Sequence, residues 1–198
     1  IKAAAMVMDA LVLQVEPGED GVMRGEDLDR AIGQYEMAHP THKVFAVVAT
    51  AGSTNLGIVD DLDGCGRVAE RRDIWFHVDG AYGLAGLCAP SVRPLFNGIA
   101  RADSLIVDPH KWLFAPFDAC ALIYREPHLA KKVHLQHAEY LETLDDDGEW
   151  NPSDYAIHLT RRARGLPFWF SLAANGTNEY TRAMEHTLTV GRKAARSE

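Results

Sequence analysis

Short apolar runs alternate with helical patterns along the first two thirds of this chain, and this alternation restricts the fold more than any other feature. The runs lie at 11–15, 44–50, 74–78, 104–107 and 119–124. The run at 44–50 is almost continuously apolar, as expected of a strand in a parallel sheet that helices cover on both faces. The order of elements predicts an α/β domain with a mostly parallel sheet flanked by helices. Such a domain binds its ligands at the carboxyl ends of the strands.

Helical spacing of apolar residues separates these runs. It predicts a helix over about 26–37 and a weaker one over 61–72, and helical patterns return from Asp154 and again from Asn178. Between them, residues 134–153 are polar and acidic without a sustained period. A loop of that length in a compact domain is usually functional or disordered.

The charge balance limits the partners of the chain. Its formal net charge is -8, so its surface as a whole repels nucleic acid and anionic membranes. No apolar run approaches the roughly 20 residues that a membrane-spanning helix needs. The basic run at 161–164 has no aromatic residues among its charges. We therefore expect it to pair with carboxylates or with a domain interface, not with nucleic acid.

Cysteine and histidine spacing indicates neither a disulfide framework nor a metal site. Cys65, Cys88 and Cys120 are far apart in the sequence and form no paired motif, which favours a reducing compartment and a cytoplasmic location. His134 and His137 could share a helix face, but nothing near them completes a ligand set. We expect no metal.

The first polar segment that follows a strand is ATAGST at 49–54, with Asp60 beyond it. Its small residues would let the backbone approach a ligand. An ordinary turn with a serine or threonine cap explains the segment equally well.

The second segment is HVDGAYG at 77–83. The period of two in a strand places His77 and Asp79 on the same side. A carboxylate that follows an apolar strand is costly unless it has a partner, and it would either cap the next helix or serve a ligand.

The third segment is ADSLIVDPHKW at 102–112. Lys111 follows a strand and has apolar residues on both sides, so we expect its amine to be partly buried. Burial lowers the pKa of a lysine and makes its amine a usable nucleophile. The alternative is a solvated surface lysine, which is the usual environment of this residue type.

The second and third segments together suit pyridoxal phosphate (PLP) chemistry, which needs a lysine for the cofactor aldehyde and a carboxylate for its pyridine nitrogen. HVDGAYG at 77–83 followed by ADSLIVDPHKW at 102–112 resembles the group II PLP-dependent amino-acid decarboxylases of the fold-type-I superfamily. These include aromatic-L-amino-acid, histidine and glutamate decarboxylases. The resemblance covers Ile1 to about Gly176.

The resemblance implies a role for each matching residue. Lys111 would form the Schiff base with PLP, and Asp79 would pair with the pyridine nitrogen. Ala81 would pack against the ring face and Thr54 would lie close to the ring. Asp60 would support Asp79.

Further roles concern the phosphate and the proton. His110 would sit beside the phosphate and the lysine, where its near-neutral pKa suits proton transfer. Asp108 stands where relatives commonly have asparagine, and its carboxylate would repel a phosphate. Phe117 lies where relatives make a backbone contact near the phosphate of the partner subunit.

Tyr140 bears on the type of reaction. In the decarboxylases, a tyrosine of the mobile catalytic loop helps to protonate the substrate carbon after carbon dioxide leaves. Related aldehyde synthases have phenylalanine there. A phenol can relay a proton and a phenyl ring cannot, so Tyr140 favours plain decarboxylation.

The resemblance also implies an organisation. Residues 1–176 would form part of the PLP-binding large domain, built on a seven-stranded type of sheet and including the mobile loop 134–153. Residues 177–198 would begin the small C-terminal domain. We expect a homodimer with sites at its interface. We also expect N-terminal and C-terminal portions of the same protein to be missing, among them a histidine that stacks on the cofactor.

The function that we expect is release of carbon dioxide and an amine from an L-amino acid, with an aromatic one as the first candidate. A glutamate-type substrate and aldehyde synthesis on the same fold are the enzymatic alternatives. The alternative from another class is a non-catalytic homologue that acts as a scaffold or partner. Retention of both Lys111 and Asp79 argues against it.

Overall fold

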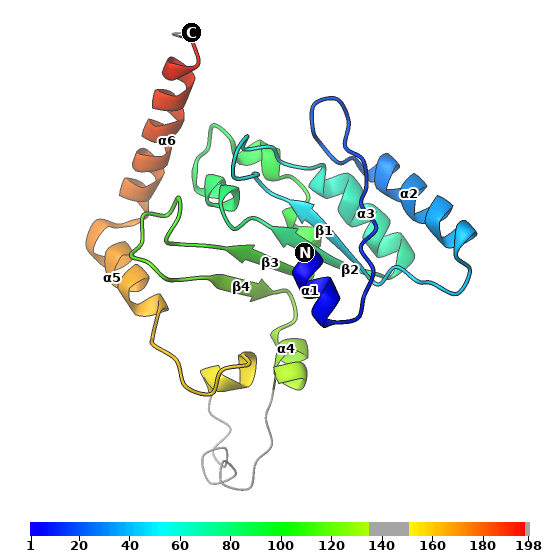
Figure 1. Cartoon of the computed structure of the whole chain (residues 1–198). Helices are drawn as coiled ribbons and strands as arrows, with labels where there is room; N and C mark the ends of the chain where they lie inside the picture. The colour runs from blue at the N-terminus through cyan, green and yellow to red at the C-terminus, as the bar shows by residue number, and fades with distance from the viewer. Residues whose placement is uncertain (135–150, 197–198) are drawn as a thin grey trace, which may run out of the picture.

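A four-stranded sheet organises the chain. The computed structural model describes residues 1–134 and 151–196. The strands β1 (Ala46–Thr50), β2 (Trp75–Asp79), β3 (Ser104–Val107) and β4 (Ala121–Tyr124) lie side by side in that order (Figure 1). The first three are parallel, and β4 runs antiparallel to β3. The mostly parallel α/β sheet predicted from the sequence is therefore present.

Helices cover the sheet and extend from its ends. In Figure 1, α3 lies between the sheet and α2, while α5 and α6 lie where β3 ends. The α-helices are α1 (Lys2–Val7), α2 (Gly25–Ala38), α3 (Leu62–Arg72), α4 (Pro127–His134), α5 (Gly165–Asn175) and α6 (Thr177–Ala194). The 3-10 helices are η1 (Gly83–Cys88), η2 (Arg93–Phe96), η3 (Ile99–Arg101) and η5 (Pro152–Tyr155). None of the helices in the part of the chain just described has the length and apolar content to cross a membrane.

The sequence explains both ends of α3. Asp61 is its N-cap, and its carboxylate accepts a hydrogen bond from the Gly64 backbone at 2.9 Å. At the other end Asp73 adopts a left-handed conformation, with φ 54°, and stops the helix. Gly25 lets α2 approach α3 closely, because a Cβ at this position would lie 2.5 Å from the Gly64 backbone carbon.

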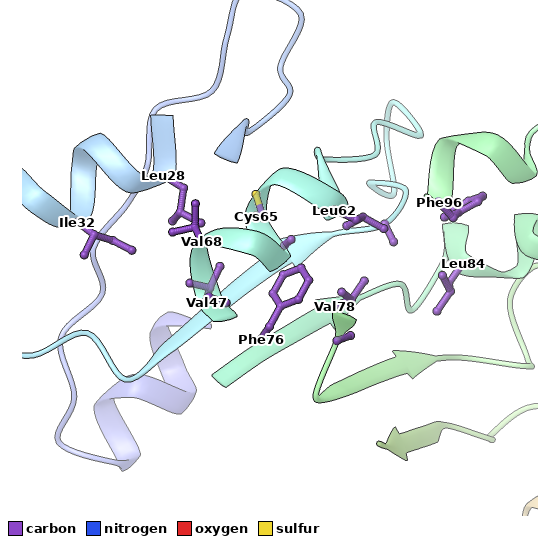
Figure 2. Packing of buried hydrophobic residues seen from close by; sticks show 14 residues of the cluster. Leu28, Ile32, Val47, Leu62, Cys65, Val68, Phe76, Val78, Leu84 and Phe96 are labelled. Carbon is purple, nitrogen blue, oxygen red and sulfur yellow. The ribbon is translucent and has the colours of Figure 1, made fainter. Parts of the chain in front are cut away.

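The main core fills the space between the sheet and these two helices. Burial alternates along β1 and β2, so that Val47, Phe76 and Val78 face α3 while His77 and Asp79 face the other side. Phe76 is only 1% exposed. Figure 2 shows how this core is assembled from α2, α3, the sheet and the 3-10 helices. Its labelled members are Leu28, Ile32, Val47, Leu62, Cys65, Val68, Phe76, Val78, Leu84 and Phe96.

A second, smaller cluster joins α6 to the region around the candidate lysine. Tyr180 and Met184 of α6 are buried together with Ala85 and Leu113. The first half of α6 therefore packs on the same body as the sheet. The division into a domain over 1–176 and the start of another over 177–198 stays a prediction.

Two expected strands differ from the structure. Residues 11–15 form no strand, so that prediction was wrong. Leu13 and Val15 pack against the core from an irregular segment, while Leu11 is 73% exposed. A short apolar run can thus belong to a half-buried segment that pairs with no strand. The strand expected over 119–124 begins only at Ala121, because the backbone of Ala119 bonds to the ring of His110.

Truncation of Phe76 should show how much the fold depends on the main core. Phe76→Ala leaves a cavity between β2 and α3, so we expect the free energy of unfolding to fall by about 3–5 kcal/mol. Urea or guanidinium unfolding followed by circular dichroism measures this change. The control is Phe45→Ala, since Phe45 is 61% exposed just before β1 and should change stability by no more than about 0.5 kcal/mol. Equal losses in the two variants would contradict this description of the core.

Candidate active site

The three polar segments predicted from the sequence meet at one edge of the sheet. Thr50 pairs with Asp79, and Asp79 pairs with Ile106, so the carboxyl ends of β1, β2 and β3 are level. The segments continue to bond beyond the strands. Ala51 N donates to Asp79 O at 2.8 Å, and Gly80 N donates to Ile106 O at 3.2 Å.

The link that matters most for the site joins the second and third segments. Asp108 N donates to Ala81 O at 3.0 Å. The loop that carries Asp79 and the loop that carries Lys111 are therefore held together by their backbones. The idea that these two side chains face opposite ends of one pyridine ring remains a prediction.

Asp79 is the last residue of β2 and is exposed. Its Oδ1 accepts a hydrogen bond from Ala81 N at 3.2 Å, which is a local turn contact. Among the residues that the structure describes, no donor bonds to Oδ2. The carboxylate thus keeps an acceptor available at the edge where ligands of parallel sheets bind.

His77 lies on the same side of β2 and has a defined partner. Its Nδ1 lies 2.8 Å from Ser104 Oγ, which also accepts from Trp75 Nε1 at 2.9 Å. Burial lowers the pKa of the His77 imidazole below its usual value of 6.5, while the nearby Asp79 opposes this shift. The structure therefore favours a neutral ring behind Asp79.

Lys111 lies in a turn with Asp108. Lys111 N donates to Asp108 O at 3.0 Å, and Lys111 Nζ lies 2.8 Å from Asp108 Oδ2. The Lys111 side chain is 36% exposed and that of Asp108 is 13% exposed. The apolar flanks predicted a partly buried amine but gave no sign of the carboxylate beside it. The flanking Trp112 instead stacks on Tyr82 and leaves the amine beside a carboxylate.

His110 is held next to the lysine by the loop that follows. Its Nδ1 lies 2.6 Å from Ala119 O, a distance at which the ring N–H donates to the carbonyl. Its ring also meets Phe117 edge-on, with 5.1 Å between centroids. The ring is thus oriented by its neighbours, while Phe117 itself is 80% exposed.

Asp60 supports the site in a different way from the one expected. Its carboxylate accepts from Thr50 N at 2.7 Å and from Met23 N at 2.9 Å, and not from a group of Asp79. Burial raises the pKa of the Asp60 carboxyl above its usual range, although both backbone donors oppose this. Asp60 therefore fixes the end of β1, which in turn pairs with β2. Thr54 is exposed in the loop between the end of β1 and Asp60.

Sequence reasoning missed one contact that is central to the site and anticipated another. Cys120 lies close enough to Asp108 for its thiol to donate a hydrogen bond to that carboxylate. The sequence carried no signal for this, since 12 positions separate the two residues. The expected pairing of the basic run is confirmed, because Arg162 and Arg164 both form ion pairs with Asp118.

Tyr140 and most of the loop 134–153 lie outside the described residues. Within the ranges 1–134 and 151–196, no cluster of three or more histidine, cysteine or acidic side chains could hold a metal ion.

A cavity of about 390 Å³ lies at the opposite edge of the sheet, near the amino ends of β2 and β3. Its charged lining is already paired, with Arg101 bonded to Asp63 and Glu70, and Arg125 bonded to Asp103. This cavity therefore does not compete with the carboxyl edge as the candidate site.

Comparison with known proteins identifies the family. The family described as "Pyridoxal-dependent decarboxylase conserved domain" matches residues 1–197. The chain belongs to this family. The resemblance seen in the sequence and the fold class that it implied are therefore confirmed.

The relatives act on different substrates, by their names. An aromatic-L-amino-acid decarboxylase of Bacillus atrophaeus is 38% identical over 73% of this chain and 30% of its own length. The acidic amino acid decarboxylase GADL1 of Xenopus tropicalis is 35% identical over 91% of this chain and 36% of its own length. The chain thus spans about a third of the length of these curated relatives.

Solved structures agree with the fold. The crystal structure of mouse CSAD superposes with a TM-score of 0.85 and 31% identity, over 99% of this chain and 41% of that one. The structure of Oryza sativa TDC with PLP and tryptamine gives a TM-score of 0.81 and 26% identity, over 91% of this chain and 38% of that one.

The buried ring of His77 should leave a signature in stability. The unfolded chain binds a proton at this histidine near pH 6.5, whereas the folded chain resists it. The free energy of unfolding should therefore be highest above about pH 6.5 and fall as the pH decreases towards about 5. In His77→Gln this slope should be smaller. Denaturant unfolding at a series of pH values measures it, with the exposed His128→Gln as control. A steeper slope in His77→Gln would contradict the prediction.

Proposed function

We propose that the protein containing this chain is a PLP-dependent decarboxylase that converts an L-amino acid into carbon dioxide and an amine. One observation carries the proposal: Asp79 and Lys111 stand on adjacent loops that the bond from Asp108 N to Ala81 O joins at the carboxyl edge of the sheet. Membership of the family supports it.

The residues present fit the cofactor. The free acceptor of Asp79 would bind the pyridine N–H, and the amine of Lys111 would hold the aldehyde carbon. Ala81 follows Asp79 with a methyl group in place of a larger side chain, which leaves room for the face of a flat ring. His110, with its ring oriented by Ala119, would stand beside the phosphate.

The chain's own groups would then handle charge and protons. Bound PLP supplies an electron sink for the pair of electrons left when the carboxylate departs. The Asp79 carboxylate would keep the pyridine nitrogen protonated, which that sink requires. His110 and the Tyr140 hydroxyl would return a proton to the α-carbon, so that an amine is released.

An aromatic amino acid is the substrate that we propose first. DPHKW at 108–112 and AEYL at 138–141 are more similar to the aromatic group, and the Bacillus atrophaeus relative is named for it. Acidic substrates are the second candidate, because GADL1 and the human cysteine sulfinic acid decarboxylase are also similar, the latter at 34% identity.

We also propose a homodimer in the cytoplasm, with the site near the dimer interface. Apolar side chains are exposed on the site's side of the molecule: Phe117 is 80% exposed, and Trp169 and Phe170 of α5 are each 59% exposed. A surface of this kind is typical of an interface. The three cysteines are unpaired, as is usual in a reducing compartment.

Replacement of Lys111 tests the proposal. With the complete polypeptide and added PLP, we expect a visible absorbance band that is absent in Lys111→Ala. Release of amine and carbon dioxide from candidate amino acids should fall by at least about a thousandfold, because the lysine acts throughout the reaction. The exposed Lys43→Ala is the matched control. Amine formation at the parental rate in Lys111→Ala would refute the proposed function.

Replacement of Tyr140 tests the type of reaction. Tyr140→Phe removes only the hydroxyl that would return the proton, so the yield of amine should fall about a hundredfold while PLP binding stays unchanged. A share of the product should become aldehyde and ammonia, which chromatography of the reaction mixture measures. If the parental protein itself makes aldehyde, plain decarboxylation is the wrong assignment.

A further inference from the structure

The Asp108 carboxylate lies 2.8 Å from the amine of Lys111, the lysine that the proposed function requires. We propose that Asp108 is a positioning residue whose carboxylate holds the Lys111 amine in an ion pair until the cofactor arrives, so that Asp108 governs how readily the lysine captures an aldehyde. This inference rests on the proposed function and deepens it. It concerns the regulation of the same site.

The carboxylate has little freedom to turn away. Asp108 is anchored through both of its backbone groups: its N–H donates to Ala81 O and its C=O accepts from Lys111 N, each at 3.0 Å. Its side chain is only 13% exposed, whereas most ion pairs within residues 1–134 and 151–196 involve more exposed carboxylates. The 2.8 Å distance to Lys111 Nζ is that of a charge-assisted hydrogen bond.

Cys120, the residue before β4, lies near the same carboxylate. Burial first, and then the hydrogen bond to Asp108, raise the pKa of the Cys120 thiol to about 11. The thiol is therefore protonated at neutral pH and remains a donor. Asp108 is thus paired with Lys111 and lies near the Cys120 thiol.

The ring of the neighbouring His110 is directed elsewhere. Its Nδ1 bonds to Ala119 O, so this nitrogen does not compete for the Asp108 carboxylate. The group that pairs with the Asp108 carboxylate is thus the Lys111 amine, with the Cys120 thiol nearby. This arrangement leaves the Asp108 carboxylate paired with the amine of Lys111.

The consequence follows from the chemistry of an amine. An ammonium group has no lone pair, so it must release a proton to solvent before nitrogen attacks an aldehyde carbon. A C–N bond then forms, the aldehyde oxygen leaves as water, and a C=N bond replaces the C=O bond. A carboxylate at ion-pair distance opposes the first of these steps, because it favours the charged amine.

The cofactor's own charge would act in the opposite direction. A phosphate bound near His110 would repel the carboxylate of Asp108, and it would compete for the Lys111 ammonium. The same residue would therefore slow a reaction of the amine with aldehydes that lack a phosphate. This is a form of selection that an asparagine at position 108 could not provide.

The first experiment measures the amine without any cofactor. The complete polypeptide, freed of PLP, is treated briefly with acetic anhydride at pH 8, and the acetylation of Lys111 and Lys43 is compared by mass spectrometry. In Asp108→Asn we expect Lys111 to react about three- to fivefold faster, the range expected for loss of a partly exposed ion pair. Lys43 should not change. Asp20→Asn, which removes an exposed ion pair with Arg24, should leave Lys111 as it was.

Cys120 reports on the same carboxylate in the same samples. Loss of the Asp108 charge should favour the Cys120 thiolate, so its alkylation by iodoacetamide should become faster in Asp108→Asn, while the exposed Cys88 is unaffected. Circular dichroism checks that each variant is folded. Asp108→Ala serves as a second variant and should behave in the same way. Unchanged Lys111 and Cys120 rates in folded variants would overturn the inference.

The second experiment separates the inference from the proposed function. PLP and pyridoxal, which lacks the phosphate, are added to the cofactor-free protein, and the visible absorbance band is followed in time. Asp108→Asn should react with pyridoxal about three- to fivefold faster, with a smaller gain for PLP. If the variant shows faster Lys111 acetylation but neither protein forms a band, the proposed function fails and the ion pair stands. If both form bands at equal rates for both aldehydes, the inference fails alone.

Discussion

The candidate site depends on hydrogen bonds between backbones at the carboxyl edge of three parallel strands. Level register brings Thr50, Asp79 and Ile106 to one line, and the bond from Asp108 N to Ala81 O continues the pairing into the loops. Side chains that are 32 positions apart, at 79 and 111, thereby share one edge. Because backbone groups make these links, the edge tolerates variation in side chains better than a site built on side-chain contacts would.

Behind that edge, buried and partly buried polar side chains hold the strands in place. The Asp60 carboxylate holds the end of β1 through Thr50 N, and Ser104 connects Trp75 of β2 with His77. Each of these groups satisfies a donor or acceptor that would otherwise be buried without a partner, which costs about 1–3 kcal/mol. The polar residues of the motifs are thus divided between those that shape the edge and those, such as Asp79, that keep an acceptor free.

Local patterns in the sequence predicted most of the elements, because apolar period and turn residues act over a few positions. The helix α2 and strands β1 to β3 fall within about two residues of their expected bounds. Errors arose where distant groups decided the outcome. Residues 11–15 have a strand's composition but no strand to pair with, and the start of β4 is displaced because Ala119 bonds to His110. The carboxylate beside Lys111 was not anticipated for a related reason: flanking letters cannot show that Trp112 turns to Tyr82 while Asp108 turns to the amine.

The position of Asp108 shows why a motif and its electrostatics are separate questions. Asparagine and aspartate both accept hydrogen bonds and both suit the turn that precedes Pro109, so the backbone of the motif is the same with either residue. Only the aspartate adds a charge, and in a side chain that is 13% exposed this charge is weakly screened. The fold of the lysine loop can therefore stay the same while an exchange of asparagine for aspartate at position 108 changes the reactivity of the lysine. In this chain the Asp108 charge is paired with Lys111, and it also helps to raise the pKa of the nearby Cys120 thiol.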